Sequence, residues 1–303
     1  MKILHSIAEL STLPGPLVLA IGVFDGVHLG HRAVIERALS DARIAGGRAV
    51  VVTFDPHPAR VLRPEQSPLL LTCTRHKQRL IATLGVEHLL IIPFDGKLAA
   101  TEPAEFIREI SAAANPLRQI CVGENWAFGK GRAGNITLLK TLGASMGFGA
   151  VGIPDVQLDG RPVSSTAIRM AVQAGDLTTA AKLLGRDFSI LGTVVEGKKM
   201  GRSIGFPTAN LASNNEQLPP NGVYAVSARL LGAELRGVAN VGVRPTVEDA
   251  GARICEVHLF DYQGEFYGEE MEVSFQRFIR EERKFQSLDA LREQIALDVK
   301  AAR

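Results

Sequence analysis

The first part of the chain alternates between short apolar runs and longer segments of helical periodicity. The apolar runs cover residues 17–23, 49–54, 88–93, 119–123 and 149–156. Between them, apolar residues recur at three- and four-residue spacing in segments 32–43, 74–84, 103–113 and 137–146. Runs without polar alternation are typical of strands that are covered on both faces. Strand and helix in repetition therefore predict a doubly wound parallel sheet with right-handed crossovers.

The pattern changes near residue 186. Segments 165–173 and 177–184 are predicted to form two helices, and Gly185 would end the second. Strand-like segments with glycine-containing connections follow at 188–195, 223–231, 235–241, 254–262 and 270–275. Short strands at this spacing predict a small antiparallel β-barrel. The apolar stripe of a closing helix follows, made of Leu288, Leu291, Ile295 and Val299. We therefore expect an α/β protein with two domains, 1–186 and 187–303.

Composition agrees with a globular protein of two domains. The 303 residues are 46% hydrophobic and 22% charged, and 34 basic against 32 acidic residues give a net charge of +2. This balance provides no broad field that would attract nucleic acid. The apolar stretch 16–24 is too short to span a bilayer and lacks a cleavage pattern. We expect a cytoplasmic protein with no nucleic-acid or membrane partner, as a monomer or weak homo-oligomer.

The three cysteines give no sign of a disulfide framework or a structural zinc site. Cys73, Cys121 and Cys255 are odd in number and widely separated, and no CxxC pair occurs. We expect them to be small buried apolar residues.

The turn after the first predicted strand carries candidate chemistry. Residues 22–31 include Gly22, Phe24, His28, Gly30 and His31, and a helix is predicted to follow. Ligands of parallel sheets lie beyond the carboxyl ends of strands, and a helix N-terminus suits phosphate. A single histidine here could be a capping or packing residue, and a metal pair would need a third ligand. The spacing of three places both imidazoles on one side of the opening turn, which favours nucleotide phosphates.

A second candidate phosphate site follows the last strand of this domain. Ser164, Ser165 and Thr166 precede or begin a predicted helix, where hydroxyls can cap the helix and donate to phosphate oxygens. Arg169 lies one turn beyond Ser165 and could reach the same anion. Taken alone, the segment could equally be a plain N-cap with a surface arginine.

Residues 192–210 form the most specific stretch of the chain. Gly197, Gly201 and Gly205 permit a backbone loop that closes on phosphate, and Lys198 or Lys199 could add positive charge. Such a loop alone could be an ordinary hairpin connection. Pro207 then fixes the chain, and Thr208 and Asn210 supply hard oxygen ligands, which suit Mg²⁺ when substrate phosphates complete its shell.

Together these motifs resemble the bacterial bifunctional riboflavin kinase/FMN adenylyltransferase (FAD synthetase) family over nearly the whole chain. The matching motifs are HxGH at 28–31, SSTxxR at 164–169, PTAN at 207–210 and EVH at 256–258. The resemblance implies a Rossmann-like nucleotidyltransferase domain followed by a flavokinase barrel. It also implies ATP as co-substrate, Mg²⁺ as cofactor, and riboflavin, FMN and FAD as the other ligands.

In the first domain, the resemblance implies that His28 and His31 stabilise charge on the α-phosphate of ATP. The other implied ATP contacts are Gly22, Phe24, Gly30, Ser164, Ser165, Thr166 and Arg169. An isoalloxazine ring needs aromatic or apolar faces with a few polar groups at its rim. The implied flavin contacts are Phe54, Pro56, His57, Pro58, Asn125, Trp126 and Phe128. The chain departs from the family pattern at Val23 and Asn125, where we expect altered affinity rather than loss.

In the second domain, the resemblance implies an ATP loop with Mg²⁺ on Thr208 and Asn210. The implied ATP contacts are Gly197, Lys198, Gly201, Gly205, Thr208 and Asn210. Strand alternation places Ile254, Glu256, His258 and Phe260 on one face, where a carboxylate is often merely solvated. The resemblance instead makes Glu256 the general base for the ribityl 5′-hydroxyl and a flavin contact. Arg280 is a further flavin contact, unless it belongs to a solvated charge cluster.

Three alternative functions can be compared with these motifs. Residues 28–31 and 199–203 superficially resemble the two signatures of class I aminoacyl-tRNA synthetases. The second element lies in the β-rich part, however, and no basic tRNA surface is evident. A non-enzymatic flavin-binding protein would not need His28, His31, Thr208, Asn210 and Glu256. An enzyme that retains only one of the two activities is the third alternative.

Overall fold

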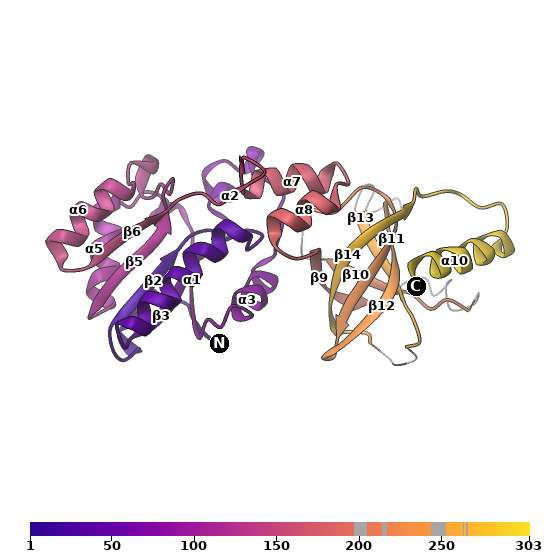
Figure 1. Ribbon diagram of the computed structural model, residues 1–303, viewed down its shortest axis with the longest axis horizontal. Coiled ribbons are helices and arrows are strands. Elements are labelled where there is room, and N and C mark those ends of the chain that lie inside the picture. Colours follow the sequence, from indigo (N-terminus) through magenta and orange to yellow (C-terminus); the bar gives the residue numbers. More distant parts are fainter. Residues whose placement is uncertain (197–204, 214–216, 244–252, 263, 265) are drawn as a thin grey trace. The chain divides into compact units, whose positions relative to one another are not determined.

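The computed structural model describes residues 1–196, 205–213, 217–243, 253–262, 264 and 266–303. They form two compact units, drawn in Figure 1. The first contains residues 1–68 and 77–164, and the second contains residues 69–76 and 165–303. The second unit thus includes α7 (Ser165–Gln173) and α8 (Leu177–Leu184), whose bounds are those expected from the sequence. The domain boundary after residue 186 stays a prediction.

The first unit is built on a six-stranded sheet whose paired strands are all parallel. The order across the sheet is β1 (Lys2–Leu4), β4 (His88–Pro93), β3 (Arg48–Asp55), β2 (Leu17–Ile21), β5 (Leu117–Gly123) and β6 (Gly149–Ile153). The doubly wound parallel sheet is confirmed. The edge strand β1 was not expected, because three residues are too few to show a periodicity.

Helices cover both faces of this sheet (Figure 1). Val18 and Ala20 of β2 pack with α1 (Leu29–Ile44) and the Leu80–Ile81 part of α3 (Thr74–Ala82). The alternate residues of β2 pack on the other side with η1 (Ile7–Thr12), α5 (Pro103–Ala113) and α6 (Ile136–Met146). Burial on both faces explains why the strand sequences lack polar alternation.

The order of the strands creates a switch point at β2. From β2 the chain proceeds to β3 and β4 on one side, and then returns to the other side as β5. Ligands of open α/β sheets bind at the carboxyl ends of strands where the order reverses. The loops after β2, β3 and β5 meet this condition.

Shorter elements of the unit are α2 (Pro58–Leu62), η2 (Pro64–Gln66), α4 (Gly96–Ala99), η3 (Lys130–Arg132), β7 (Gln157–Leu158) and β8 (Arg161–Pro162).

The second unit contains a closed antiparallel barrel, which confirms the second fold prediction. Its strands are β9 (Phe188–Val195), β10 (Ala209–Ser213), β11 (Gly222–Leu230), β12 (Ala233–Val243), β13 (Arg253–Leu259) and β14 (Glu270–Arg280). Around the barrel their order is β10-β13-β12-β11-β14-β9, and β9 pairs back onto β10. β10 was not expected, because it lacks the β-branched and aromatic residues that mark strands.

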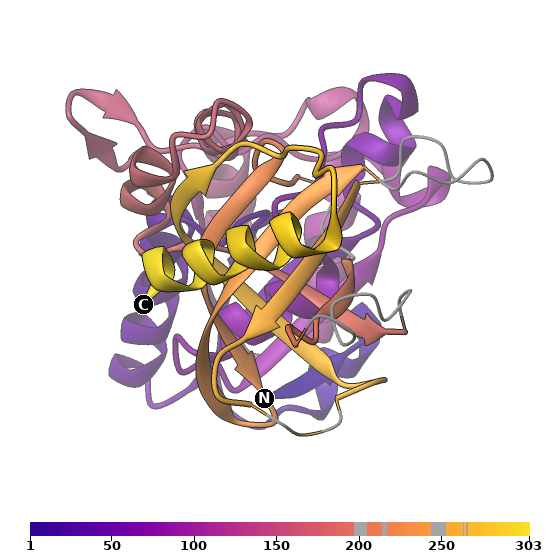
Figure 2. The same cartoon turned by 90° about the vertical axis from the view of Figure 1, so that its right-hand side faces the viewer.

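The predicted closing helix is α10 (Leu288–Ala302), which runs across the barrel strands in Figure 2. Its N-cap is Ser287, whose hydroxyl accepts a hydrogen bond from the N–H of Ala290 at 3.2 Å. Val299 packs with Val223 of β11 and Val238 of β12, as part of a core cluster. The helix therefore forms one wall over the barrel.

All three cysteines are buried, as expected. Burial raises the pKa of Cys121 to about 11 and that of Cys255 to about 12, so both thiols stay protonated near neutral pH.

Candidate active sites

The turn after β2 has an unusual backbone. Phe24, Gly26 and Val27 have φ angles of 52°, 85° and 41°, in the left-handed region that favours glycine. A Cβ on residue 22 would lie 2.8 Å from the ring of Phe24, so only glycine fits there. Residues held in this region store strain, which is common where a chain must present functional groups. Here the turn delivers His28 to the N-terminus of α1.

His28 and His31 form a stacked pair at that helix start. Their ring centroids are 3.5 Å apart with an interplanar angle of 18°, and Phe24 packs edge-on against His31 at 5.3 Å. His28 is the N-cap, because its Nδ1 accepts a hydrogen bond from the N–H of His31 at 3.3 Å. An accepting Nδ1 requires the hydrogen of a neutral imidazole to be on Nε2. The helix start therefore presents ring and backbone N–H groups that suit a phosphate.

Gly30 has a more local reason to be glycine than the nucleotide contact suggested by the sequence. A Cβ on residue 30 would lie 3.2 Å from the ring of His28. A side chain there would therefore push against the stacked histidine.

A cavity of about 450 Å³ lies at the carboxyl ends of the strands in the first unit. Phe54 lies near the end of β3. Trp126 and Phe128 follow β5, and their rings stack at 4.3 Å with an interplanar angle of 13°. Five of the predicted flavin contacts line it, namely Phe54, Pro58, Asn125, Trp126 and Phe128. Further lining residues are Val23, Arg63, Phe94, Leu98, Phe106 and Arg132. The cavity is mostly apolar with aromatic walls, as a planar ring system requires.

Pro56 and His57 are not among the residues that line this cavity. His57 is instead the N-cap of α2, and its Nδ1 accepts a hydrogen bond from the N–H of Ala59 at 3.1 Å. Asn125 lines the cavity with its amide nitrogen held by Asp155, at 2.8 Å from Nδ2 to Oδ2. The sequence motif could not reveal this partner, which lies 30 residues further along the chain.

The SSTxxR segment falls at the junction of the two units. Ser164 is the last residue of the first unit, whereas Ser165, Thr166 and Arg169 begin α7 in the second. Within the second unit, Nε of Arg169 donates a hydrogen bond to the carbonyl oxygen of Leu69 at 2.7 Å. A shared phosphate site of these residues with the two histidines stays a prediction.

The second unit contains a cavity of about 240 Å³ between the barrel and α10. Thr208, Glu256 and Arg280 all line it, although they come from three separate parts of the sequence. Its apolar wall consists of Phe206, Val223, Val238, Phe285, Leu288, Leu291 and Ile295. A hydroxyl, a carboxylate and a guanidinium thus converge on a largely apolar chamber, the usual composition of a small-molecule site.

The barrel register explains why Glu256 meets the PTAN segment. Glu256 on β13 pairs with Asn210 of β10 on one side and with Asn240 of β12 on the other. His258 Nδ1 donates a hydrogen bond to the carbonyl oxygen of Pro207 at 2.9 Å, which holds the chain just before Thr208. Oxygen-bearing side chains therefore lie side by side on neighbouring strands.

The structure describes only one of the glycines predicted for the ATP loop of the kinase reaction. Gly197, Lys198 and Gly201 lie outside the described residues. Gly205 is described, with a φ of 87°, which requires glycine or a strained residue there.

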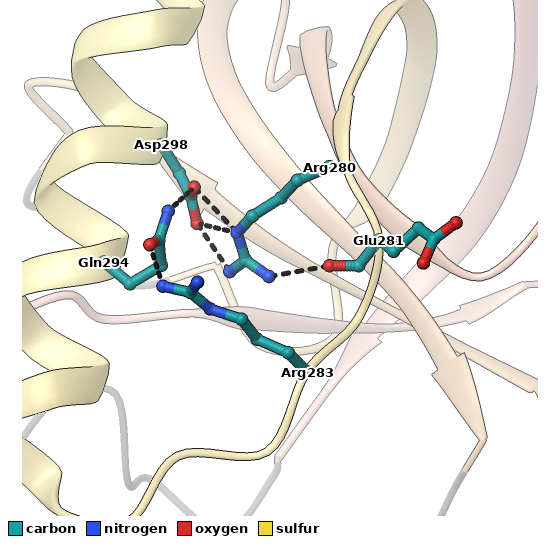
Figure 3. A network of polar contacts seen from close by, with 5 residues as sticks. All are labelled: Arg280, Glu281, Arg283, Gln294 and Asp298. Carbon is teal, nitrogen blue, oxygen red and sulfur yellow. Dashed lines mark hydrogen bonds and ion pairs between the residues drawn. The ribbon is translucent and has the colours of Figure 1, made fainter.

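Arg280 is held by a polar network that the sequence did not reveal (Figure 3). Asp298 of α10 accepts from Nε at 2.9 Å and from Nη2 at 2.7 Å, while Nη1 donates to the carbonyl oxygen of Glu281 at 2.9 Å. Gln294 donates to the same Asp298 at 2.7 Å and accepts a hydrogen bond from Arg283. The guanidinium of Arg283 lies 4.9 Å from the centroid of the Phe285 ring. Arg280 is thus an oriented lining residue rather than a solvated charge.

The position of Asp298 in the sequence is itself informative. It follows Leu291 by seven positions and Ile295 by three, so it lies on the apolar stripe of the helix. The side chain of Asp298 is 4% exposed. A carboxylate on such a stripe indicates that a cation lies opposite it, because burying an unpaired charge is unfavourable.

Comparisons with known proteins agree with this geometry. A family model described as FAD synthetase matches residues 11–167, and one described as riboflavin kinase matches residues 184–303. A bifunctional riboflavin kinase/FMN adenylyltransferase of Escherichia coli K12 is 40% identical over 306 residues, covering 100% of this chain and 97% of that protein. One of Bacillus subtilis 168 is 38% identical over 291 residues, covering 94% and 91%.

A solved structure resembles nearly the whole chain. It is described as a macrolide-efflux protein from Streptococcus pneumoniae, with a TM-score of 0.82 at 31% identity, and the match covers 96% of this chain and 94% of that one. In the present chain, the described residues include no helix of the length and apolarity needed to cross a bilayer. Two family models that together span most of the chain, and relatives identical at 38–40%, place it in one family. The chain belongs to the bifunctional riboflavin kinase/FMN adenylyltransferase family.

Proposed function

We propose that this chain converts riboflavin to FMN in the barrel unit, and FMN to FAD in the parallel-sheet unit, with ATP as co-substrate of both reactions. The observation that carries this proposal is the barrel cavity, which gathers Thr208, Glu256 and Arg280 against an apolar wall. The aromatic cavity beside the turn after β2 supports the second reaction.

In the barrel, Glu256 serves as the general base. Its carboxylate accepts the proton of the ribityl 5′-hydroxyl while that oxygen attacks the γ-phosphorus of ATP, and ADP leaves. The apolar wall with Phe285 and Leu288 excludes water from the attacking oxygen, which protects the phosphoryl group from hydrolysis. Arg280, oriented by Asp298, contacts the flavin, so the ring fixes where the hydroxyl lies.

Thr208 and Asn210 fit the requirements of Mg²⁺ because both carry oxygen donors, and Glu256 lies opposite Asn210 in the barrel register. Mg²⁺ prefers oxygen ligands and completes its shell with substrate phosphates. When bound there, the ion would neutralise charge on the transferring phosphoryl group. Thr208 and Asn210 would orient the triphosphate toward Glu256.

In the parallel-sheet unit, the flavin of FMN occupies the cavity lined by Phe54, Trp126 and Phe128. An oxygen of the FMN phosphate attacks the α-phosphorus of ATP, the bond to the bridging oxygen breaks, and pyrophosphate leaves. No proton transfer is required, so catalysis is positioning and charge stabilisation. His28 and His31 donate to the α-phosphate from the helix start. Gly22, Phe24 and Gly30 shape the turn that holds ATP, and Ser164, Ser165, Thr166 and Arg169 contact the triphosphate.

We also propose that Gly197, Lys198, Gly201 and Gly205 contact the phosphates of ATP in the kinase reaction. Pro56 and His57 stiffen the segment beside the flavin in the other reaction. We expect the enzyme to act in the cytoplasm as a monomer or weak homo-oligomer. Riboflavin, FMN, FAD and ATP are its ligands.

Product stoichiometry tests the proposal. Purified protein is incubated with Mg²⁺, ATP and one flavin at a time, and flavins and nucleotides are then quantified. Riboflavin should give equal amounts of FMN and ADP at early times, and FMN should give equal amounts of FAD and pyrophosphate. Formation of only one product pair would reduce the enzyme to a single activity. No product from either flavin would favour a binding protein.

A further inference from the structure

A buried lysine lies beneath the turn that carries the two histidines. Lys77 of α3 is 5% exposed, and its ammonium group lies 2.8 Å from the carbonyl oxygen of Val23. The hydroxyl of Thr53 on β3 donates to the same carbonyl oxygen at 3.0 Å and lies 3.3 Å from the ammonium. One carbonyl group therefore receives two hydrogen bonds, from two neighbouring elements of the first unit.

The carbonyl group of Val23 lies at the start of the turn that carries the two histidines, so a contact to it affects the whole turn. Val23 directly precedes Phe24, the first of the residues with positive φ, and Phe24 packs against His31. The carbonyl of Val23 and the N–H of Phe24 belong to one rigid peptide plane. Fixing that plane fixes where the left-handed turn begins, and so where His28 and His31 lie. Strained backbone of this kind persists only when its surroundings hold it.

Burying a lysine to donate a hydrogen bond to the Val23 carbonyl costs free energy. Thr53 already supplies a neutral donor, and burying an ammonium group costs more free energy than burying a hydroxyl. A charged donor makes a stronger hydrogen bond than a neutral one. It also places a positive charge one residue away from a turn that has to accept a triphosphate.

We propose that Lys77 is a positioning residue for adenylyl transfer, which acts through the carbonyl group of Val23 on the histidine-bearing turn. This inference rests on the proposed function of the first unit. The main-chain carbonyl of residue 23 makes the contact, so the contact does not depend on which side chain stands there. Val23 itself is among the residues that line the aromatic cavity, whereas Lys77 is not.

The test compares Lys77→Met with the wild-type protein in both reactions. We expect kcat for FAD formation to fall about 100-fold, the effect of a misplaced reactive geometry. The KM for ATP in that reaction should rise several-fold. Riboflavin phosphorylation by the same preparation should be unchanged.

Two further variants separate positioning from stability. Thr53→Val removes the second donor to the Val23 carbonyl without changing side-chain volume much, and should shift the same parameters less. Ile81→Val trims the buried face of the same helix and leaves the lysine contact intact, so it should lower thermal stability without raising the KM for ATP. A lower folded fraction reduces the rate but does not change a KM.

The proposal is overturned if Lys77→Met keeps kcat and the KM for ATP within about twofold of wild type. It is also overturned if both activities fall together, or if Ile81→Val reproduces the kinetic change. Failure of the wild-type protein to form FAD from FMN would refute the proposed function itself, before any variant is compared.

Discussion

Glu256 lies between two asparagines in the barrel register, Asn210 on one side and Asn240 on the other. A carboxylate in this polar row, at the wall of the barrel cavity, can accept the proton of the attacking hydroxyl. Glu256→Gln keeps the size of the side chain and removes its basicity. Riboflavin phosphorylation should fall about 100-fold or more, in the range typical of general-base removal.

The matched control for Glu256→Gln is the second reaction of the same chain. FAD formation from supplied FMN should stay at the wild-type rate, measured by chromatography of the flavins. A loss of both activities in the variant would argue against separate sites.

His28 combines a structural and a chemical task, and the two can be separated. As N-cap it accepts a hydrogen bond from the N–H of His31, and in the proposed reaction its imidazole donates Nε2–H to the phosphate. His28→Asn retains a capping acceptor, whereas His28→Ala removes it, at a cost of about 1 kcal/mol in stability. Both variants should lose about 100-fold in FAD formation, and only His28→Ala should unfold at a lower temperature. Wild-type FAD synthesis by His28→Asn would show that the imidazole is not required.

At the scale of elements, α10 acts on the barrel cavity through Asp298. Removing one charge of a buried ion pair is strongly destabilising, by about 3 kcal/mol, because the partner stays buried. Asp298→Asn should therefore lower the stability of the chain and raise the KM for riboflavin, as Arg280 loses its fixed orientation. Asp289→Asn is the matched control, since Asp289 lies on the same helix but is exposed. An unchanged KM in Asp298→Asn would contradict the positioning of Arg280 by this helix.

A second ion pair fixes segment 69–76 to the barrel within the second unit. His76 Nε2 lies 3.1 Å from Glu272 Oε1, and the hydroxyl of Ser189 donates to the same oxygen at 3.0 Å. Burial raises the pKa of Glu272, but the hydrogen bonds and charge of His76, with help from Ser189 and Arg229, lower it to about 2.

This pKa predicts how stability depends on pH. The folded value of about 2 lies below the ordinary value of 4.5, so the ionised carboxylate, when paired with His76, stabilises the fold. That contribution is lost as the pH falls from about 4.5 toward 2. Urea unfolding of Glu272→Gln should show a weaker pH dependence over this interval than wild type. Parallel curves for the two proteins would contradict the linkage.

The sequence predicted elements well where burial was uniform or the periodicity was strong. The parallel strands are of this kind, because their apolar residues report directly on the buried faces. The stripe of α10 is a weaker case, since Leu291, Ile295 and Val299 are half-buried and Leu288 is exposed. β10 was missed because its pairing with β9 and β13, not its composition, makes it a strand. Barrel closure depends on pairing between strands that are distant in the sequence, which a short stretch of sequence cannot show.

The candidate sites show the same division. Motif spacing indicated Thr208 and the two histidines, and the family resemblance indicated Glu256, since each lies in a short recognisable segment; their roles stay predictions. Lys77 and Asp155 were missed because each acts on a residue far away in the sequence. Asp298 showed a sign in its place on the apolar stripe, but its partner Arg280 became visible only in the fold.

At the scale of the whole molecule, each unit has its own cavity. The aromatic cavity belongs to the parallel-sheet unit, and the cavity with Glu256 belongs to the barrel unit. The product of one reaction is the flavin substrate of the other, so both reactions can run in sequence on one chain.

A time course that starts from riboflavin tests this account most directly. Purified protein is mixed with riboflavin, excess ATP and Mg²⁺, and riboflavin, FMN and FAD are separated chromatographically at intervals. The account predicts that FMN appears first and that FAD accumulates after it at the expense of FMN. If riboflavin is consumed and FMN alone persists with ATP still in excess, or if riboflavin is not consumed at all, the account of two consecutive reactions in one chain is contradicted.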